Sequence, residues 1–163
     1  MNDAESRVGA GAPELRISPA AETDLPWCAR VMASTDPWIT LGREYDACLA
    51  RVRCSELEVF VARRDATLLG FVLLHPTGVA GSPYIASIAV AAEARGGGVG
   101  TALVKFAEAH YPGARHMFLC VSSFNQRARL LYERLGYRAV GELPDYVIEG
   151  ASEVLMHKRL VRG

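Results

Sequence analysis

The chain has 163 residues, half of them hydrophobic and 22% charged, and its 18 basic residues balance its 18 acidic ones. This length fits one domain with a sizeable core. Zero net charge argues against a protein that binds nucleic acid through a basic surface, because neutralising phosphates requires clustered Lys and Arg in excess. No apolar run is long enough to span a bilayer, so we expect no membrane association.

The cysteines and the N-terminal residues carry no sign of a metal site or an export signal. No two of the four cysteines are spaced as CxxC, and the four histidines form no metal-type array with them. Residues 1–14 lack the basic start and apolar core of a secretory signal. We therefore expect no metal, free thiols and a cytoplasmic protein.

The chain begins with a polar stretch and then becomes regular. Residues 1–12 are small and polar, and we expect a disordered tail ahead of a single domain over residues 13–163. The alternating segment 14–18 predicts a short strand, and apolar residues spaced three and four apart in 22–34 predict a helix. Pro37 disfavours helical geometry at the preceding residue and separates this helix from the next segment.

The middle of the chain predicts a helix followed by a strand meander. The helix is expected over 42–54. Two strand-like runs, 56–63 and 67–76, are separated by a short turn and predict a hairpin, to which 83–91 adds a third strand. A glycine-rich cluster then leads into a predicted helix over 101–110.

The last part of the chain predicts one more helix between strands. Segment 115–122 is almost continuously apolar, which predicts a strand buried on both faces. A helix is expected over 125–137, closed by Gly136, and two antiparallel strands over 137–143 and 152–160. The order of elements predicts a mixed α/β fold.

The stretch EARGGGVGTAL, residues 93–103, needs a physical reason, because glycine costs backbone entropy wherever it sits. It follows a predicted strand and opens a predicted helix. The first turn of a helix presents unpaired N–H groups at the positive end of its dipole, and glycines just before it let an anion approach them. Phosphate is the natural ligand of such a loop.

Two familiar phosphate-binding patterns do not fit this stretch. A P-loop requires Gly-Lys followed by Ser or Thr, but Gly100 is followed by Thr101. The dinucleotide pattern GxGxxG fails from each glycine that could open it. A nucleotide-hydrolysing or dinucleotide enzyme is therefore disfavoured. The pattern Arg-x-x-Gly-x-Gly does fit, as Arg95, Gly98 and Gly100.

A second motif lies about 25 residues further on, in the segment VSSFNQRARLLYERLGY. It contains, in order, Asn125, Ala128, Leu131, Tyr132, Gly136 and Tyr137. Together with the Arg-x-x-Gly-x-Gly loop, this motif resembles the GNAT superfamily of acyl-CoA-dependent N-acyltransferases. The resemblance covers roughly residues 14–160 and is motif-specific from about 84 to 142.

The resemblance implies a single domain with a mostly antiparallel, twisted sheet of about seven strands, splayed in the middle and flanked by about four helices. It implies an enzyme that transfers the acetyl group of acetyl-CoA to a primary amine of a small molecule or peptide, by direct attack in a ternary complex. The alternative is a non-catalytic domain that binds acyl-CoA as a sensor or regulator. Relatives often dimerise through their last strands, so a homodimer stays open.

The resemblance also implies where the coenzyme binds. Backbone N–H groups of the glycine loop would hold the pyrophosphate, and the preceding strand would pair with the pantetheine arm and could donate an N–H to the oxyanion. Arg95 either adds charge near the phosphates or faces solvent. The implied coenzyme-binding residues are Ile88, Ala89, Val90, Arg95, Gly96, Gly97, Gly98, Val99, Gly100, Thr101 and Asn125.

Tyr132 is the candidate acid for the departing thiolate, since a phenol with a pKa of ~10 can protonate a thiolate whose pKa is ~8.5. Asn125 lies seven residues earlier, on the same helical face. Tyr132 could instead complete the apolar stripe of its helix. Asn125 could bind the pantetheine amides, cap the helix, or do both.

The general base is not evident from the sequence. Cys120 stands where peptide N-terminal acetyltransferases of the family commonly carry a carboxylate, and a thiol in an apolar strand more often packs than catalyses. The other candidates are Glu44, His75, Asp145 and Glu149, or a water chain leading to one of them.

The acceptor site is expected in the segment between the first two helices. Trp38 and Tyr45 could line an acceptor pocket there, with Arg43 or Glu44 selecting the charge of the substrate. The alternative is that both aromatic rings pack over the edge of the sheet.

Overall fold

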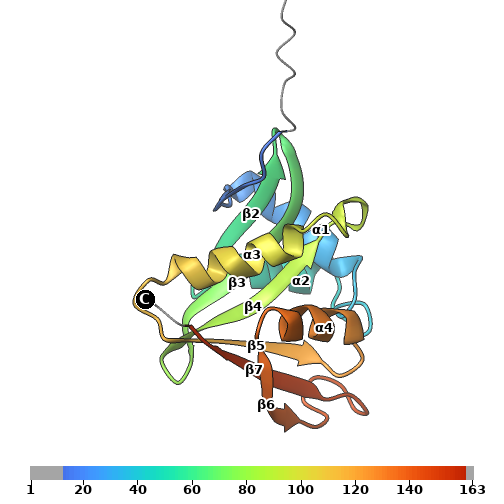
Figure 1. The fold of residues 1–163 in the computed structure, drawn as a ribbon. Helices are drawn as coiled ribbons and strands as arrows, with labels where there is room; N and C mark the ends of the chain where they lie inside the picture. Colours follow the sequence, from blue (N-terminus) through green and yellow to red (C-terminus); the bar gives the residue numbers. More distant parts are fainter. Residues whose placement is uncertain (1–12, 161–163) are drawn as a thin grey trace, which may run out of the picture.

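A seven-stranded sheet runs through the part of the chain that the structure describes, residues 13–160 (Figure 1). In this computed structural model the strands lie in the order β1-β2-β3-β4-β5-β7-β6. The tail expected over residues 1–12 lies outside the described residues, as do residues 161–163. None of the described helices combines the length and apolar character needed to cross a bilayer.

The helices and strands follow one another in the order that the sequence predicted, which confirms the mixed α/β class. In chain order they are β1 (Arg16–Pro19), α1 (Leu25–Ala33), α2 (Tyr45–Val52), β2 (Glu58–Arg64), β3 (Thr67–Val79), β4 (Ser82–Val90), α3 (Val99–His110), β5 (His116–Ser122), α4 (Gln126–Arg134), β6 (Arg138–Leu143) and β7 (Glu153–Arg159). α2 is shorter than predicted, because the backbone of Glu44 is still extended, with ψ at 172°.

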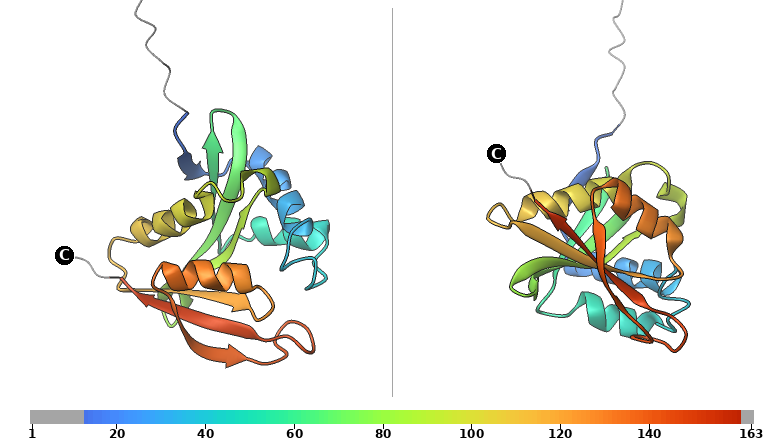
Figure 2. Two further views of the ribbon diagram at one scale, coloured as in Figure 1. Left: turned by 45° about the vertical axis from the view of Figure 1, so that its right-hand side comes forward. Right: turned by 60° about the horizontal axis from the view of Figure 1, so that its bottom comes forward.

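The helices cover both faces of the sheet. α3 and α4 lie in front of the strands in Figure 1 and α1 and α2 behind them, and the two views in Figure 2 show the same layers. Successive residues of β3 enter different cores, because side chains alternate across a strand. Phe71 and Leu73 pack in the core under α1 and α2, whereas Val72 and Leu74 pack in the core under α3 and α4.

The parallel neighbours β4 and β5 pair over only a short length. Tyr84 lies opposite Phe118 and Ile85 lies opposite Leu119, and these are the pairs between the two strands. Beyond them the strands diverge toward the right of Figure 1. The rest of β4 pairs with β3 on one side, and its other edge is open. We call this divergence the fork; it gives the sheet the splayed middle that the resemblance implied.

The prediction that segment 115–122 is buried on both faces is wrong. Met117, Leu119 and Val121 are buried in the core under α3 and α4. Phe118 and Cys120 point to the opposite face and are only half-buried. That face borders the fork. The apolar residues of β5 therefore pack in the core on one face and adjoin a cleft on the other.

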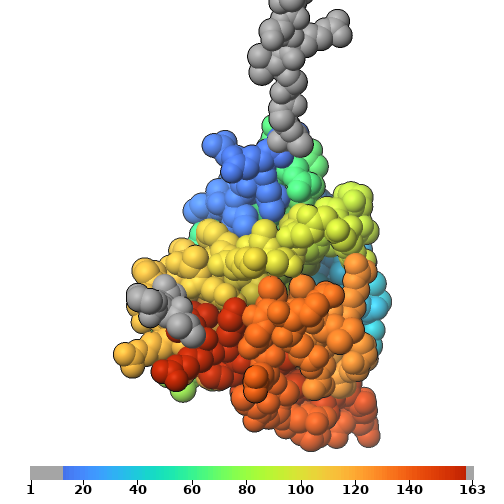
Figure 3. Space-filling view, in the orientation of Figure 1, coloured from blue at the N-terminus to red at the C-terminus, as the bar shows by residue number. Residues whose placement is uncertain are grey.

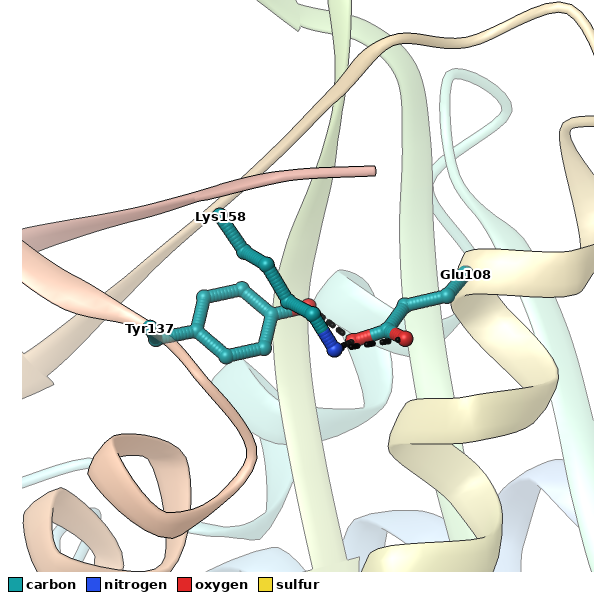
Figure 4. Close-up of polar contacts among 3 residues, drawn as sticks. All are labelled: Glu108, Tyr137 and Lys158. Atoms are coloured by element: carbon teal, nitrogen blue, oxygen red, sulfur yellow. Dashed lines mark hydrogen bonds and ion pairs between the residues drawn. The ribbon is translucent and has the colours of Figure 1, made fainter. Parts of the chain in front are cut away.

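One carboxylate joins three elements on the α3 side of the sheet (Figure 4). Tyr137, which follows α4, donates its hydroxyl to Glu108 Oε1 on α3 at 3.0 Å. Lys158 Nζ on β7 lies 2.9 Å from Glu108 Oε1 and 3.0 Å from Oε2. Burial and the charge of Glu108 raise the pKa of Tyr137, so the phenol stays protonated and keeps donating.

The packing of α3 on the sheet depends on a glycine in β3. A Cβ atom at Gly70 would lie 2.8 Å from the Ala89 carbonyl oxygen, 3.1 Å from Val99 Cγ1 and 3.2 Å from Leu103 Cδ1. The first of these distances is closer than a real Cβ approaches a backbone oxygen. Gly70 therefore lets the first half of α3 lie directly against β3 and β4.

We expect Gly70→Ala to lower the free energy of unfolding by about 1–3 kcal/mol, because the added methyl overpacks a core that has no space for it. Gly113→Ala is the matched control: its Cβ would meet nothing within 4 Å. Its effect should stay within about 1 kcal/mol. Urea unfolding measures both. A Gly70→Ala protein as stable as the wild type would mean that α3 lies further from the sheet than described.

Candidate active site

An open cleft of about 1210 Å³ lies where β4 and β5 diverge. It extends along the first turns of α3 and α4 on one face of the sheet, and along α2 and the α1–α2 connection on the other. On the first of these faces, Figure 3 shows α3 and α4 next to each other. Molecules that enter from opposite faces can therefore meet at the fork.

A β-bulge shapes the β4 wall of the cleft. Residues 85 and 87 pair with consecutive residues of β3, so Ala86 is the extra residue between them. A bulge reverses the alternation of side chains along its strand. Ile85 and Ile88 accordingly contact the same core under α3 and α4, whereas Ala86 and Ala89 contact the core under α1 and α2.

Arg51 on α2 holds this bulge. Its Nη2 donates to the Ala86 carbonyl oxygen at 2.8 Å, and its Nε donates to Ser87 Oγ at 2.9 Å. Ser87 Oγ in turn donates to the same Ala86 carbonyl oxygen at 2.7 Å. The carbonyl that the bulge removes from the regular ladder is therefore satisfied by a charged donor, and the shape of β4 at the fork is fixed.

The glycine loop after β4 has the conformation that its sequence requires. Gly96 and Gly98 have φ angles of +80° and +82°, a region that side chains with a Cβ rarely adopt. Gly98 is the N-cap residue of α3. A Cβ at Gly100 would lie 3.5 Å from Leu131 Cδ2 on α4, which is an ordinary van der Waals distance, so the first turn of α3 lies next to α4. The unpaired N–H groups of that turn border the cleft.

Arg95 is exposed at the mouth of the cleft and reaches across it. Its Nη2 donates to Thr35 Oγ1 in the α1–α2 connection and its Nε donates to the Val90 carbonyl oxygen, both at 3.4 Å. The side chain thus bridges the end of β4 and the opposite wall. Its positive charge lies beside the glycine loop, which is one of the two alternatives that the sequence left open for Arg95.

The structure gathers nearly all the residues expected at the coenzyme. Those that line the cleft are Ile88, Ala89, Val90, Arg95, Gly96, Gly98, Val99, Gly100, Thr101 and Asn125. Gly97 is not among the lining residues. Asn125 caps α4, with its Oδ1 accepting from the Ala128 N–H at 3.3 Å. The cap uses the oxygen of the side chain and leaves the amide nitrogen available to the cleft.

Tyr132 lies on α4 with its side chain in the wall of the cleft. It is only 6% exposed, and its ring meets the ring of Tyr137 edge-on at 6.2 Å. Burial raises the pKa of Tyr132, so its hydroxyl stays protonated. Among the described residues nothing accepts a hydrogen bond from this hydroxyl. Tyr132 is therefore a core tyrosine that also lines the cleft.

The residues expected at the acceptor are only partly assembled. Trp38 and Arg43 line the cleft. Tyr45 packs against the core under α1 and α2, and Glu44 is exposed beside the first turn of α2; neither lines the cleft.

None of the four carboxylate and histidine candidates for the base lines the cleft either. Asp145 accepts from the Gly150 N–H at 2.6 Å, and His75 Nδ1 accepts from the Thr77 N–H at 3.2 Å, both within their own turns. Glu44 and Glu149 are exposed. Cys120 does line the cleft, and burial raises the pKa of its thiol.

Several lining residues at the fork did not follow from sequence reasoning. Tyr84 on β4 lines the cleft with Cys120, and burial raises the pKa of its phenol. Glu153, the first residue of β7, lies opposite Ser122 on β5. The pairing of β5 with β7 brings Ser122 and Glu153 together, and no local signal in the sequence indicates it. Within residues 13–160, no group of three or more His, Cys, Asp or Glu side chains could hold a metal ion.

Comparison with known proteins decides the family. The model of the acetyltransferase (GNAT) family matches residues 23–137, which include the meander, the glycine loop and α4. The chain belongs to the GNAT acetyltransferase family. The match ends at the motif that closes with Gly136 and Tyr137, so it contains both motifs that carry the resemblance.

Individual relatives agree with this assignment. An uncharacterized N-acetyltransferase from Methanocaldococcus jannaschii is 37% identical over 103 residues, which span 61% of this chain and 65% of that protein. A GNAT-family protein from Desulfovibrio desulfuricans has the same fold, with a TM-score of 0.77 and 21% identity over 91% of this chain and 100% of its own. An aminoglycoside 6'-N-acetyltransferase complexed with coenzyme A has a TM-score of 0.73 and 18% identity, covering 91% of this chain and 98% of its own.

We expect Gly98→Val to raise the dissociation constant for acetyl-CoA by about tenfold or more, because a β-branched residue at a φ of +82° distorts the anion-binding turn. Gly81→Val is the matched control, since Gly81 has a φ of +78°, equally open surroundings and a position in the β3–β4 turn. Calorimetric titration should find the control's affinity unchanged. Equal affinities in both folded variants would show that the loop does not hold the coenzyme.

Proposed function

We propose that the protein transfers the acetyl group of acetyl-CoA to a primary amine by direct attack in a ternary complex. The observation that supports this proposal most strongly is the fork, where the cleft is open to both faces of the sheet. A thioester arriving along α3 and α4 and an amine arriving along α2 would meet there. Membership of the GNAT family supports the same reaction.

The donor side would bind coenzyme A through backbone groups. The pyrophosphate would accept hydrogen bonds from the N–H groups of Gly98, Val99 and Gly100, with the dipole of the 12-residue helix α3 and Arg95 adding positive charge. The open edge of β4 carries unpaired N–H and C=O groups, with which the pantetheine amides would pair as an added strand does. The coenzyme A complex of a structural neighbour supports this choice of ligand.

The oxyanion would be stabilised at the β4 bulge. Acyl transfer to an amine passes through a tetrahedral oxyanion, and preorganised N–H donors are the usual means of stabilising it. The Arg51 contacts to Ala86 and Ser87 keep this part of the backbone rigid, so its N–H groups would need no reorganisation when charge develops.

Tyr132 would assist the departure of the thiolate leaving group. Because burial raises the pKa of its phenol, the hydroxyl remains a donor at neutral and mildly alkaline pH. It would donate a hydrogen bond to the sulfur as the carbon–sulfur bond breaks. Because its pKa is raised above that of a thiol, the proton that restores the thiol would come from water. The free amide nitrogen of Asn125 would donate to the pantetheine arm close by.

The acceptor is proposed only as a class: a small molecule or peptide with a primary amine. The acceptor side of the cleft carries charges of both signs, with Arg43, Arg51, Asp36 and Glu153 among its lining residues. This mixture does not select a polycation or a polyanion.

The test is to measure acetyl-CoA binding by calorimetry and thiol release with four amines: lysine, spermidine, kanamycin and the dipeptide alanyl-alanine. Turnover with one of them together with binding supports the enzyme. Binding without turnover favours the alternative of an acyl-CoA sensor. Absence of binding contradicts both.

For the leaving group, we expect Tyr132→Phe to lower kcat by about 10- to 100-fold while the acetyl-CoA dissociation constant stays unchanged, since only the hydroxyl is lost. The control is Tyr111→Phe, whose hydroxyl donates to Glu58 rather than facing the cleft. The wild type should also lose no activity up to about pH 10 through ionisation of Tyr132, because its pKa is raised. Wild-type kcat in Tyr132→Phe would leave the tyrosine a packing role only.

A further inference from the structure

A carboxylate lies at the fork, on the strand next to β5. In the antiparallel β5–β7 pair, Glu153 lies directly opposite Ser122, and Ser122 Oγ donates to Glu153 Oε1 at 2.5 Å. Both residues line the cleft. Ser122 is only 4% exposed, so its hydroxyl is a buried, oriented donor. Glu153 is half-buried, and its Oε2 accepts no hydrogen bond from any described residue.

Glu153 occupies the face of the sheet on which Cys120 lies. Residues directly opposite each other in a sheet share a face, and Cys120 and Ser122 lie on the same face of β5 because they are two residues apart. The electrostatic influence of Glu153 on Cys120 and on Tyr84 is consistent with this placement. β7 thus supplies a carboxylate beside the position where β5 has a thiol.

The other titratable groups at the fork are poor proton acceptors. Burial, with the charge of Glu153 adding to it, raises the pKa of both Tyr84 and Cys120, so both stay protonated. Among the described residues, the other titratable groups that line this side of the cleft are Asp36, Arg43, Cys48, Arg51 and Tyr146.

The second carboxylate among the described lining residues is Asp36. It is exposed in the α1–α2 connection and accepts from Thr40 N at 3.1 Å and from Thr40 Oγ1 at 2.6 Å, within its own loop.

We propose that Glu153 is the general base of the acetyl transfer and that Ser122 positions it. This inference rests on the function proposed above. The acceptor enters as an ammonium ion, and the free Oε2 of Glu153 takes one proton from it. The resulting neutral amine forms the nitrogen–carbon bond to the thioester. Ser122 holds Oε1, which turns Oε2 toward the fork.

The protons balance without any further reagent. When the oxyanion collapses, the carbon–sulfur bond breaks and its electron pair leaves on sulfur. The attacking nitrogen loses its second proton to water, and the thiolate, which the Tyr132 hydroxyl stabilises by a hydrogen bond, takes a proton from water. Glu153 returns its proton to solvent. The products are the amide, the free thiol of coenzyme A and one released proton.

The test compares two kinds of acceptor with Glu153→Gln, an isosteric change that keeps the contact with Ser122 possible. At about pH 7.5 the fastest amine of the panel is an ammonium ion and needs a base, whereas hydroxylamine is mostly neutral and small enough to enter any acceptor pocket. We expect Glu153→Gln to lower kcat/KM for the amine about a hundredfold, and the enzyme-dependent rate with hydroxylamine by no more than about threefold. Ser122→Ala should give a smaller loss with the same selectivity.

The matched control is Glu142→Gln, an exposed β6 carboxylate outside the cleft, which should behave as the wild type with both acceptors. Equal losses with amine and hydroxylamine would overturn the proposal, because they would mean that Glu153 supports the structure or oxyanion instead. An unchanged amine rate would overturn it as well. Calorimetry separates the two levels: a wild type that does not bind acetyl-CoA contradicts the proposed function, whereas binding and turnover that ignore Glu153 contradict only this inference.

Discussion

The early end of pairing between β4 and β5 is the constraint on which the rest of the structure depends. A sheet that stayed paired would satisfy every backbone group and leave no passage between its faces. Because the two strands separate after Ile85 and Leu119, one edge of β4 is left without a strand partner, and the cleft opens to both faces of the sheet. The first turns of α3 and α4 and the start of β7 all border that opening.

The opening leaves backbone groups of β4 without a partner strand, and hydrogen bonds from particular side chains compensate for part of this loss. The bulge at Ala86 removes a carbonyl from the ladder, and Arg51 and Ser87 satisfy it from the side. Gly70 lets α3 rest on the sheet close to the fork, where a larger residue would push the helix away. Rigidity at the fork thus comes from packing and charged hydrogen bonds where strand pairing is missing.

Local sequence patterns predicted the elements and the glycine loop that borders the cleft, because each depends on neighbours in the chain. Gly96 and Gly98 have positive φ angles, which residues with a Cβ rarely adopt. This conformation is the physical reason for glycine that the sequence led us to look for. The other side of the cleft depends on pairing between distant segments. Ser122 and Glu153 are 31 residues apart and meet only because β7 inserts between β5 and β6. The sequence therefore offered no reason to single out Glu153 and left open as candidates Glu44, His75, Asp145 and Glu149.

The carboxylate of Glu108 ties three elements together at a point away from the cleft. It joins α3, the residue after α4 and β7 near their C-terminal ends, while the N-terminal ends of the same three elements border the fork. These three elements are therefore held together at one point, at the ends that lie away from the cleft. Since Glu108 does not line the cleft, the placement of three cleft-lining elements depends on a residue that no molecule in the cleft would touch.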